Sequence, residues 1–140
     1  MNIVDQLKRD EGVRQVPYQD SLGLWTIGVG RLIDGRKTGA GLRMSEIEQM
    51  LANDIADREQ ALRLSLPWFD SLDEVRQAVL VNMAFQLGVV GLLQFKDTLT
   101  NVREGNYAGA AAAMLLSKWR EQTPDRAKRL ATQMETGVWQ

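Results

Sequence analysis

Two carboxylic acids near the start of the chain, Glu11 and Asp20, have the residue type and the spacing of a pair that could do acid–base chemistry. Glu11 closes a helical pattern, because Ile3 and Leu7 precede it at four-residue intervals and Gly12 offers a helix stop. A carboxyl group at the end of an apolar stripe is partly desolvated, which raises its pKa and keeps it protonated near neutral pH. We therefore expect Glu11 to donate a proton.

Asp20 stands between two segments of alternating character, residues 14–19 and 24–29. The turn signal Ser21-Leu22-Gly23 follows it, so the sequence predicts a β-hairpin with an acid at its tip. An aspartate in this position also caps turns, because its carboxylate accepts a hydrogen bond from the backbone two residues on. The two roles can coexist.

The returning strand of this hairpin has two unlike faces. The first holds Thr26, Gly28 and Gly30, and the second holds Trp25, Ile27 and Val29. We expect the second face to be packed. Glycine weakens a strand, and its presence is explained if another group must approach the backbone closely. We therefore expect the first face to form the floor of a cleft, with Glu11 and Asp20 on either side. Two carboxylates across a cleft are what glycoside hydrolysis requires.

The composition narrows the chemistry further. The 140 residues include no cysteine and no histidine, which excludes disulfides, thiol chemistry, Ser-His-Asp systems and the usual zinc sites. We expect no metal and no cofactor, so carboxylates must carry any hydrolysis. A net charge of −1 and an isoelectric point near 5.5 argue against a nucleic-acid binder.

The chain resembles the T-even phage lysozymes, which are muramidases that cut the glycan of bacterial peptidoglycan. Glu11, Asp20 and Thr-Ile-Gly-Val-Gly at residues 26–30 carry the likeness. Further landmarks extend it over nearly the whole chain, at residues 1–3, 70–73, 82–86 and 122–129. The resemblance implies hydrolysis of the β-1,4 bond between N-acetylmuramic acid and N-acetylglucosamine for host cell lysis.

The same resemblance implies roles for the site residues. Glu11 would protonate the leaving oxygen, Asp20 would activate or orient the water and stabilise the cationic sugar, and Thr26 would help to hold that water. A hydroxyl near the carboxylate suggests a site with room for water, so we expect inversion at the anomeric carbon. The substrate-binding residues that we assign are Gly30, Leu32, Phe85 and Gln86.

Arg126 would be the partner of Glu11 by the same resemblance. An arginine there depresses the pKa of the acid, so burial must outweigh that pull if Glu11 is protonated. Asn82 and Gln86, four residues apart on an apolar helix, are either core amides bonded to backbone or amides that face the sugar.

Two features depart from the family pattern. Arg31 stands where we expect histidine, and we pair it with Asp54, an exposed pair that contributes about 0–1 kcal/mol. The polar connector of residues 32–43, which reads as a loop, is shorter than in the family. Both features bear on the small lobe.

We predict an α+β, mostly α, lysozyme-like fold in a single domain over residues 1–140. A small lobe of residues 12–50 carries the hairpin, and a helix over residues 45–64 links it to a helical lobe. That larger lobe comprises residues 65–140 and the N-terminal helix of residues 1–11, and the cleft lies between the lobes.

Local signals set the expected helix boundaries. Capping boxes at residues 45–48 and 71–74 open two helices, and Gly88 ends the second. Helices are expected over residues 94–103 and 107–118. Thr123 and Pro124 provide the N-cap and first residue of a last helix that ends near Gly137.

The expected partner is the peptidoglycan glycan strand, with no nucleic acid, no stable membrane association and a monomeric enzyme. Asp5 interrupts the N-terminus before a signal-peptide core can form, and the apolar run of residues 108–116 is shorter than the ~20 residues that span a bilayer. We therefore expect the host cytoplasm until lysis, with action on the wall in the periplasm. The resemblance implies release by a holin.

Two alternatives remain open. A lytic transglycosylase cleaves the same bond with one acid and forms an anhydro sugar, but it has no need of Asp20. A binding module for cell wall or nucleic acid could use the capped, basic helix of residues 123–134. The acidic isoelectric point weighs against that module. The basic residues that gather near it are Lys118, Arg120, Arg126, Lys128 and Arg129.

Overall fold

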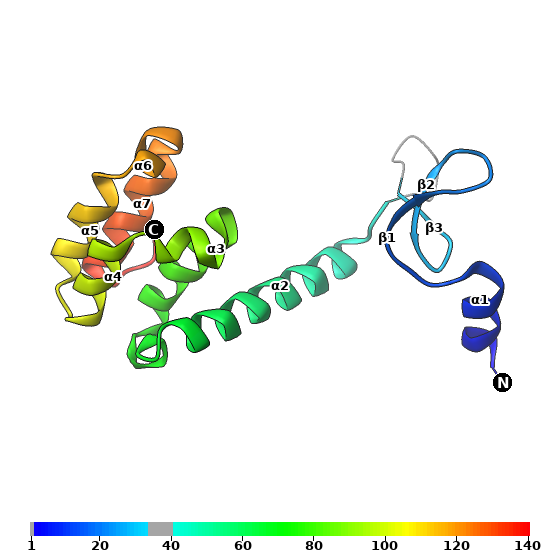
Figure 1. The fold of residues 1–140 in the computed structure, drawn as a ribbon, viewed down its shortest axis with the longest axis horizontal. Helices are drawn as coiled ribbons and strands as arrows, with labels where there is room; N and C mark the ends of the chain where they lie inside the picture. The colour runs from blue at the N-terminus through cyan, green and yellow to red at the C-terminus, as the bar shows by residue number, and fades with distance from the viewer. Residues whose placement is uncertain (1, 34–40) are drawn as a thin grey trace. The chain divides into compact units, whose positions relative to one another are not determined.

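The computed structural model describes residues 2–33 and 41–140, so most of the predicted connector lies outside the described residues. Over the described ranges the chain forms seven α-helices, one short 3₁₀-helix and three strands, which confirms a mostly helical α+β fold (Figure 1). Its contacts divide it into two units, residues 1–50 and 51–140. The boundary falls inside the long helix α2 (Met44–Ser65).

Unit 1 opens with helix α1 (Ile3–Glu11), which the sequence predicted. The backbone N–H of Asp5 donates to Asn2 Oδ1 over 3.0 Å, and the backbone N–H of Asn2 donates to Asp5 Oδ2 over 3.3 Å, which forms a capping box. Gly12 ends the helix with φ of 76°, a region that glycine adopts without penalty. The helix thus presents Glu11 as its last residue. Its expected membership of the helical lobe stays a prediction.

A three-stranded antiparallel sheet follows, with strands β1 (Arg14–Gln19), β2 (Trp25–Gly28) and β3 (Arg31–Leu32) in that order. The predicted hairpin is β1 and β2, with Tyr18 opposite Thr26. Thr26 also lies opposite Leu32 of β3. The β1–β2 register is irregular between Arg14 and Tyr18, a stretch that contains Pro17, which has no N–H to donate. Thr26 therefore occupies the central strand.

The expected burial of the β2 faces is wrong in part. Trp25 is 49% exposed and Val29 is 39% exposed, whereas Thr26 is buried. Alternation gives the two faces of a strand but does not decide which face is covered. Gly30 lies outside β2, in the turn to β3, where φ is 67°.

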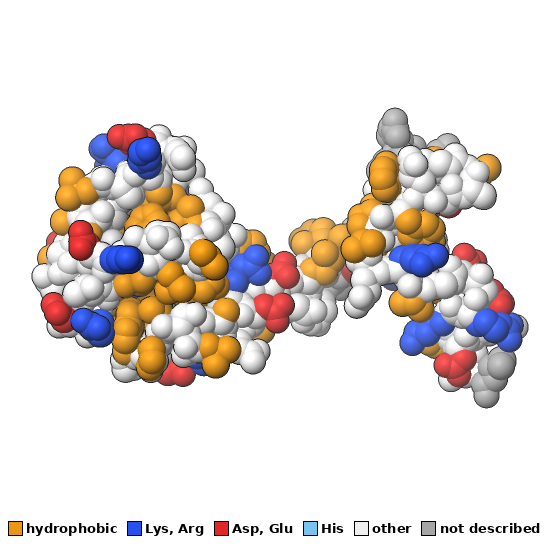
Figure 2. Space-filling model, viewed as in Figure 1, with side chains coloured by type: hydrophobic (Ala, Val, Ile, Leu, Met, Phe, Trp, Pro, Cys, Tyr) orange, Lys and Arg blue, Asp and Glu red, His pale blue; other side chains and the backbone are white. Residues whose placement is uncertain are grey.

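Unit 2 is a helical bundle built on the second part of α2 and on the 3₁₀-helix η1 (Phe69–Ser71). Its further helices are α3 (Glu74–Leu93), α4 (Lys96–Arg103), α5 (Tyr107–Leu115), α6 (Lys118–Gln122) and α7 (Pro124–Thr136). Leu62, Phe69, Leu80, Met83 and Met114 are fully buried and form part of one apolar core. Charged side chains of both signs lie at the surface of this unit (Figure 2).

Two predicted capping boxes are wrong in detail. Helix α2 begins before Ser45, and Glu46 Oε2 accepts the backbone N–H of Arg43 over 2.8 Å. Ser71 belongs to η1, and the cap of α3 is Asp73, which accepts the backbone N–H of Arg76 over 3.0 Å. In each case a carboxylate inside the predicted motif, and not its serine, makes the capping bond.

The expected ends of later helices are partly right. Gly88 interrupts the helical backbone with φ of 74°, but α3 resumes after this kink and continues to Leu93. The helix predicted over residues 107–118 ends earlier, at Leu115, and Lys118 begins a separate helix, α6, which Ser117 caps by accepting the N–H of Arg120. Pro124 begins α7, and Gly137 ends it in the left-handed conformation, as predicted.

Helix α3 is, among the described helices, the one long and apolar enough to cross a membrane by length and composition. The core helix of a soluble protein passes the same test, and Val79, Leu80, Met83 and Ala84 of α3 are fully buried in the core of unit 2.

Candidate active site

Glu11 lies against the backbone of Gly30. A Cβ atom added to Gly30 would stand 2.8 Å from Glu11 Oε2, closer than real Cβ contacts allow. The positive φ of Gly30 is also a conformation that glycine adopts most easily. Glycine at position 30 therefore lets the helix-terminal carboxylate approach the turn between β2 and β3. Glu11 is itself exposed, so unit 1 does not supply the desolvation that the sequence predicted.

Asp20 is fixed at the tip of the hairpin by its own turn. Its Oδ1 accepts the backbone N–H groups of Leu22 over 2.8 Å and Leu24 over 2.9 Å. Its backbone N–H donates to the carbonyl of Leu24 over 2.9 Å. Oδ2 has no hydrogen bond to any residue that the structure describes. The turn-capping role and a free carboxylate oxygen therefore coexist, as the sequence allowed.

Thr26 shares its partner with Asp20. Its hydroxyl donates to the carbonyl of Leu24 over 3.0 Å, so the peptide groups of Leu24 bind both side chains. Because its proton is used in this bond, the hydroxyl can only accept a further hydrogen bond. Thr26 is 3% exposed, which leaves little of it open to solvent in this structure.

The hydrogen-bonded sheet brings most of the predicted residues of unit 1 together. Glu11 touches Gly30, and Leu32, two residues on, lies opposite Thr26. Thr26 and Asp20 meet at Leu24. The two acids are thus linked through β2 and β3. A glycine turn lies next to Glu11, and Oδ2 of Asp20 has no partner among the described residues.

Arg31 has a different partner from the one we predicted. Its Nη1 and Nη2 donate to the two carboxylate oxygens of Glu46 over 2.8 and 2.9 Å, and Nη1 also donates to the carbonyl of Gly41 over 3.2 Å. Asp54 belongs to unit 2, and the Arg31–Asp54 pairing stays a prediction. The hydrogen bond from Arg31, helped by the N–H of Arg43, lowers the pKa of Glu46 to about 2. This clamp ties β3 to the first turn of α2.

In unit 2, Arg126 and Phe85 border one hollow of about 550 Å³ between α2, α3 and α7. Asn82 Oδ1 accepts from Arg126 Nε over 2.9 Å and from Nη2 over 2.6 Å. The Arg58 guanidinium lies 4.3 Å from the centre of the Phe85 ring, and its buried Nε has no hydrogen-bond partner in the described structure. Asn82 thus binds a charged side chain, and the Arg126–Glu11 pairing stays a prediction.

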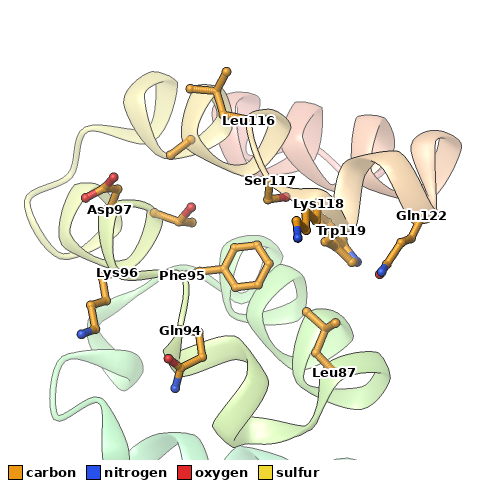
Figure 3. Close-up of a pocket in the computed structure, with 12 residues that line it drawn as sticks. Leu87, Gln94, Phe95, Lys96, Asp97, Leu116, Ser117, Lys118, Trp119 and Gln122 are labelled. Carbon is orange, nitrogen blue, oxygen red and sulfur yellow. The ribbon is translucent and has the colours of Figure 1, made fainter.

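Gln86 is hydrogen-bonded to a tryptophan that we did not predict from the sequence. Trp119 Nε1 donates to Gln86 Oε1 over 3.0 Å. Trp119 is buried and meets Phe95 edge to face, with ring centres 6.0 Å apart. Figure 3 shows the Phe95 ring in a second hollow, of about 490 Å³, with Trp119 and Lys118 at one side. The sequence feature that could have identified Trp119 is its position between Lys118 and Arg120, two of the clustered basic residues.

The described residues include no group of three or more acids that could hold a metal ion. Asp54 lies on α2, and its backbone carbonyl accepts from Arg58 Nη1 over 3.1 Å. The predicted cleft between the lobes, to which Phe85 and Gln86 would contribute, stays a prediction.

Several known proteins are similar to this chain in amino-acid sequence. The family profile for phage lysozyme matches residues 8–135. The probable T4-type lysozyme 1 of Dictyostelium discoideum is 32% identical over 98% of this chain and 95% of its own length. The endolysin of Salmonella phage P22 is 30% identical over 89% of this chain and 86% of its own length. The pre-baseplate central spike protein of Enterobacteria phage T4 is 32% identical over 98% of this chain, which spans 28% of that protein.

Proposed function

Because the chain belongs to the phage lysozyme family, a family of cell-wall hydrolases, we propose that it cleaves the β-1,4 bond between N-acetylmuramic acid and N-acetylglucosamine in peptidoglycan. One observation supports this most directly: the Glu11 carboxylate stands against a glycine turn that a side chain would obstruct. Gly30 and Leu32 are residues that we assign to the sugar, so this contact sets the acid beside the proposed binding residues. Asp20, anchored through one oxygen, supplies the second carboxylate.

Glu11 is the general acid in this proposal. It protonates the glycosidic oxygen as the bond to the anomeric carbon breaks, which removes the need to expel an alkoxide. The side chain is exposed in unit 1, where substrate can reach it. The exposed position also leaves the proton accessible to the leaving oxygen.

Asp20 and Thr26 place the attacking water. The water donates one proton to the free Oδ2 of Asp20 and the other to Thr26 Oγ1, whose own proton is engaged by Leu24. This leaves an oxygen lone pair to attack the anomeric carbon. Asp20 takes up the proton of the water as the new bond forms, and its charge stabilises the cationic sugar.

We infer inversion from this division of roles. A water molecule between acid and sugar requires carboxyl groups roughly 6.5–9.5 Å apart, against about 5–5.5 Å when one acid is a covalent nucleophile. NMR of freshly cleaved glycan, recorded before mutarotation, should show the α-anomer from the β-linked substrate. A β-anomer would make Asp20 the nucleophile, and an anhydro end would identify a transglycosylase.

The biological role that we propose is host cell lysis at the end of phage growth. The likeness to a phage endolysin supports it. The enzyme would act as a monomer without metal or cofactor, would accumulate in the host cytoplasm and would reach the wall in the periplasm after a holin opens the inner membrane. Cells that express the chain should lyse only when a holin is co-expressed, whereas lysis without one would contradict this route.

A further inference from the structure

A third hollow, of about 590 Å³, lies in unit 2 apart from every residue assigned to the glycan. We call it the Trp68 hollow, and it is bordered by the turn after α2 (residues 65–68), the end of α3 at Leu93, and one face of α4. Leu66 and Leu99 are buried, and Trp68 and Leu93 pack against the core. One side of its wall is therefore apolar.

The rim of the Trp68 hollow is positively charged. Lys96, Leu99, Thr100 and Arg103 recur at i, i+3, i+4 and i+7, so they share one face of α4 with a cation at each end. Neither cation makes an ion pair or a side-chain hydrogen bond with any described residue, and the hollow has no acid in its lining. Asp97 and Glu104 adjoin the two cations in sequence, but they do not line it.

Other arginines of this unit behave differently. Arg63 Nε donates to Asp70 Oδ1 over 2.8 Å, and Arg76 Nη1 donates to Asp73 Oδ2 over 2.9 Å. The chain has 18 acids for 17 basic residues, so partners for two more cations were available in the composition. The Trp68 hollow thus offers positive charge that no described residue pairs, beside an apolar surface, and charge complementarity calls for an anionic ligand with an apolar part.

The spacing of the two cations narrows the ligand class. Seven residues of helix rise separate them, which is about 10 Å along α4. A single phosphate is too small to meet both, whereas an extended peptide that carries two carboxylates about 10 Å apart can meet both. The hydroxyl of Thr100 lies between them as a donor for the peptide backbone.

We propose that the Trp68 hollow binds an acidic peptide, and specifically the carboxylate-bearing peptide strands attached to the glycan of the cell wall. This identification of the ligand rests on the proposed function. The peptide's carboxylates bind Lys96 and Arg103, and a small apolar side chain such as that of alanine contacts Trp68. The site would hold the enzyme on peptide-bearing wall without taking part in the chemistry.

The test is a titration of the full chain with the synthetic peptide L-alanyl-γ-D-glutamyl-meso-diaminopimelate, followed by NMR of labelled protein at low salt. The indole signal of Trp68 and the backbone signals of Leu99 and Thr100 should shift together. The double variant Lys96→Gln/Arg103→Gln should bind roughly 2- to 30-fold more weakly, the range expected for two exposed charge pairs. The peptide with its carboxylates amidated should bind as weakly to the wild-type protein.

A matched control separates a site from net charge. Arg120→Gln/Lys128→Gln removes the same two charges from exposed positions of unit 2 and should leave the affinity unchanged. Equal weakening in this control, or no shift of Trp68 at millimolar peptide, overturns the proposal. Shifts produced by inorganic phosphate or by phosphatidylglycerol vesicles, but not by the peptide, overturn it as well.

Kinetics separate this proposal from that of the glycosidase. The Lys96→Gln/Arg103→Gln protein should show a raised KM with unchanged kcat on peptide-bearing wall, and wild-type rates on glycan stripped of peptide. Normal lysis without peptide binding would refute the Trp68 site and leave the glycosidase standing. Peptide binding without glycan cleavage by the wild-type protein would refute the glycosidase alone.

Discussion

The two units of this chain are ordered by different forces. Within the described ranges, every buried apolar side chain belongs to unit 2, from Leu62 to Met134, whereas the buried residue of unit 1 is the polar Thr26. Val4, Leu7 and Trp25 of unit 1 are each about half exposed. Unit 1 is therefore ordered by caps, turns and an ion-pair clamp, and unit 2 by apolar packing.

This difference separates the residues that we assign to catalysis from the residues that stabilise the fold. The acids that we assign to catalysis lie in unit 1, held by short-range hydrogen bonds such as those from Leu22 and Leu24 to Asp20. Substitutions in unit 1 should then act mostly on activity, and substitutions in the core of unit 2 mostly on stability.

The largest effect should come from Glu11→Gln. The amide keeps the shape of the side chain but has no transferable proton, so the lytic rate on permeabilised Gram-negative cells should fall by about 10²–10⁴-fold. The free energy of unfolding should change by less than about 0.5 kcal/mol, because the side chain is exposed. Glu48→Gln, an exposed acid of α2, is the control and should lyse normally. A folded Glu11→Gln protein with half the wild-type rate would end the assignment.

Leu80→Ala should be the most destabilising single change that we consider. Leu80 is fully buried, so the cavity and the lost apolar contacts should cost about 2–5 kcal/mol, measured by urea unfolding. The lytic rate of the protein that remains folded should be close to that of the wild type. Val16→Ala, at a 68% exposed position of unit 1, should cost less than about 0.5 kcal/mol. Equal costs for the two would remove the contrast between the units.

Gly30→Ala should lower both the stability and the lytic activity to a moderate degree. The left-handed backbone should cost about 1–2 kcal/mol, and the new Cβ would displace the Glu11 carboxylate, with a loss of activity of roughly 10–100-fold. Gly23→Ala is the matched control, because Gly23 has φ of 77° but nothing within 4 Å of the added Cβ. It should lose similar stability but keep its activity. Similar activity in both variants would disprove a functional close approach at Gly30.

The smallest effect should come from the Arg31–Glu46 clamp, through its pH dependence. The pKa of Glu46 is lowered to about 2, from about 4.3 for an ordinary glutamate. Its contribution to stability should therefore be complete above pH 4.3 and should be lost as the pH falls toward 2. The difference in melting temperature between wild type and Glu46→Gln should shrink over that range. A difference that stays constant from pH 6 to pH 2 would exclude the clamp.

Much of the local structure could be predicted from the sequence, because local signals specify it. The periodicity of Ile3, Leu7 and Glu11 located α1, and the turn residues after Asp20 located the hairpin. Pro124 and Gly137 located the ends of α7. Each of these signals acts within a few residues, through a fixed φ, a missing N–H or a side chain that bonds its own turn.

Which surfaces meet was decided by the tertiary structure. The sequence did not indicate Glu46 as a partner of Arg31, 15 residues away, and only the placement of β3 against the start of α2 brings the two together. Likewise, Gln86 meets Trp119 across 33 residues, and no local pattern marks that pair. Sequence periodicity shows which residues share a face of a helix or strand. Which neighbour covers that face depends on contacts between residues far apart in the sequence. For that reason the types and order of the candidate catalytic residues could be derived from the chain alone, whereas the hydrogen bonds that hold them required the fold.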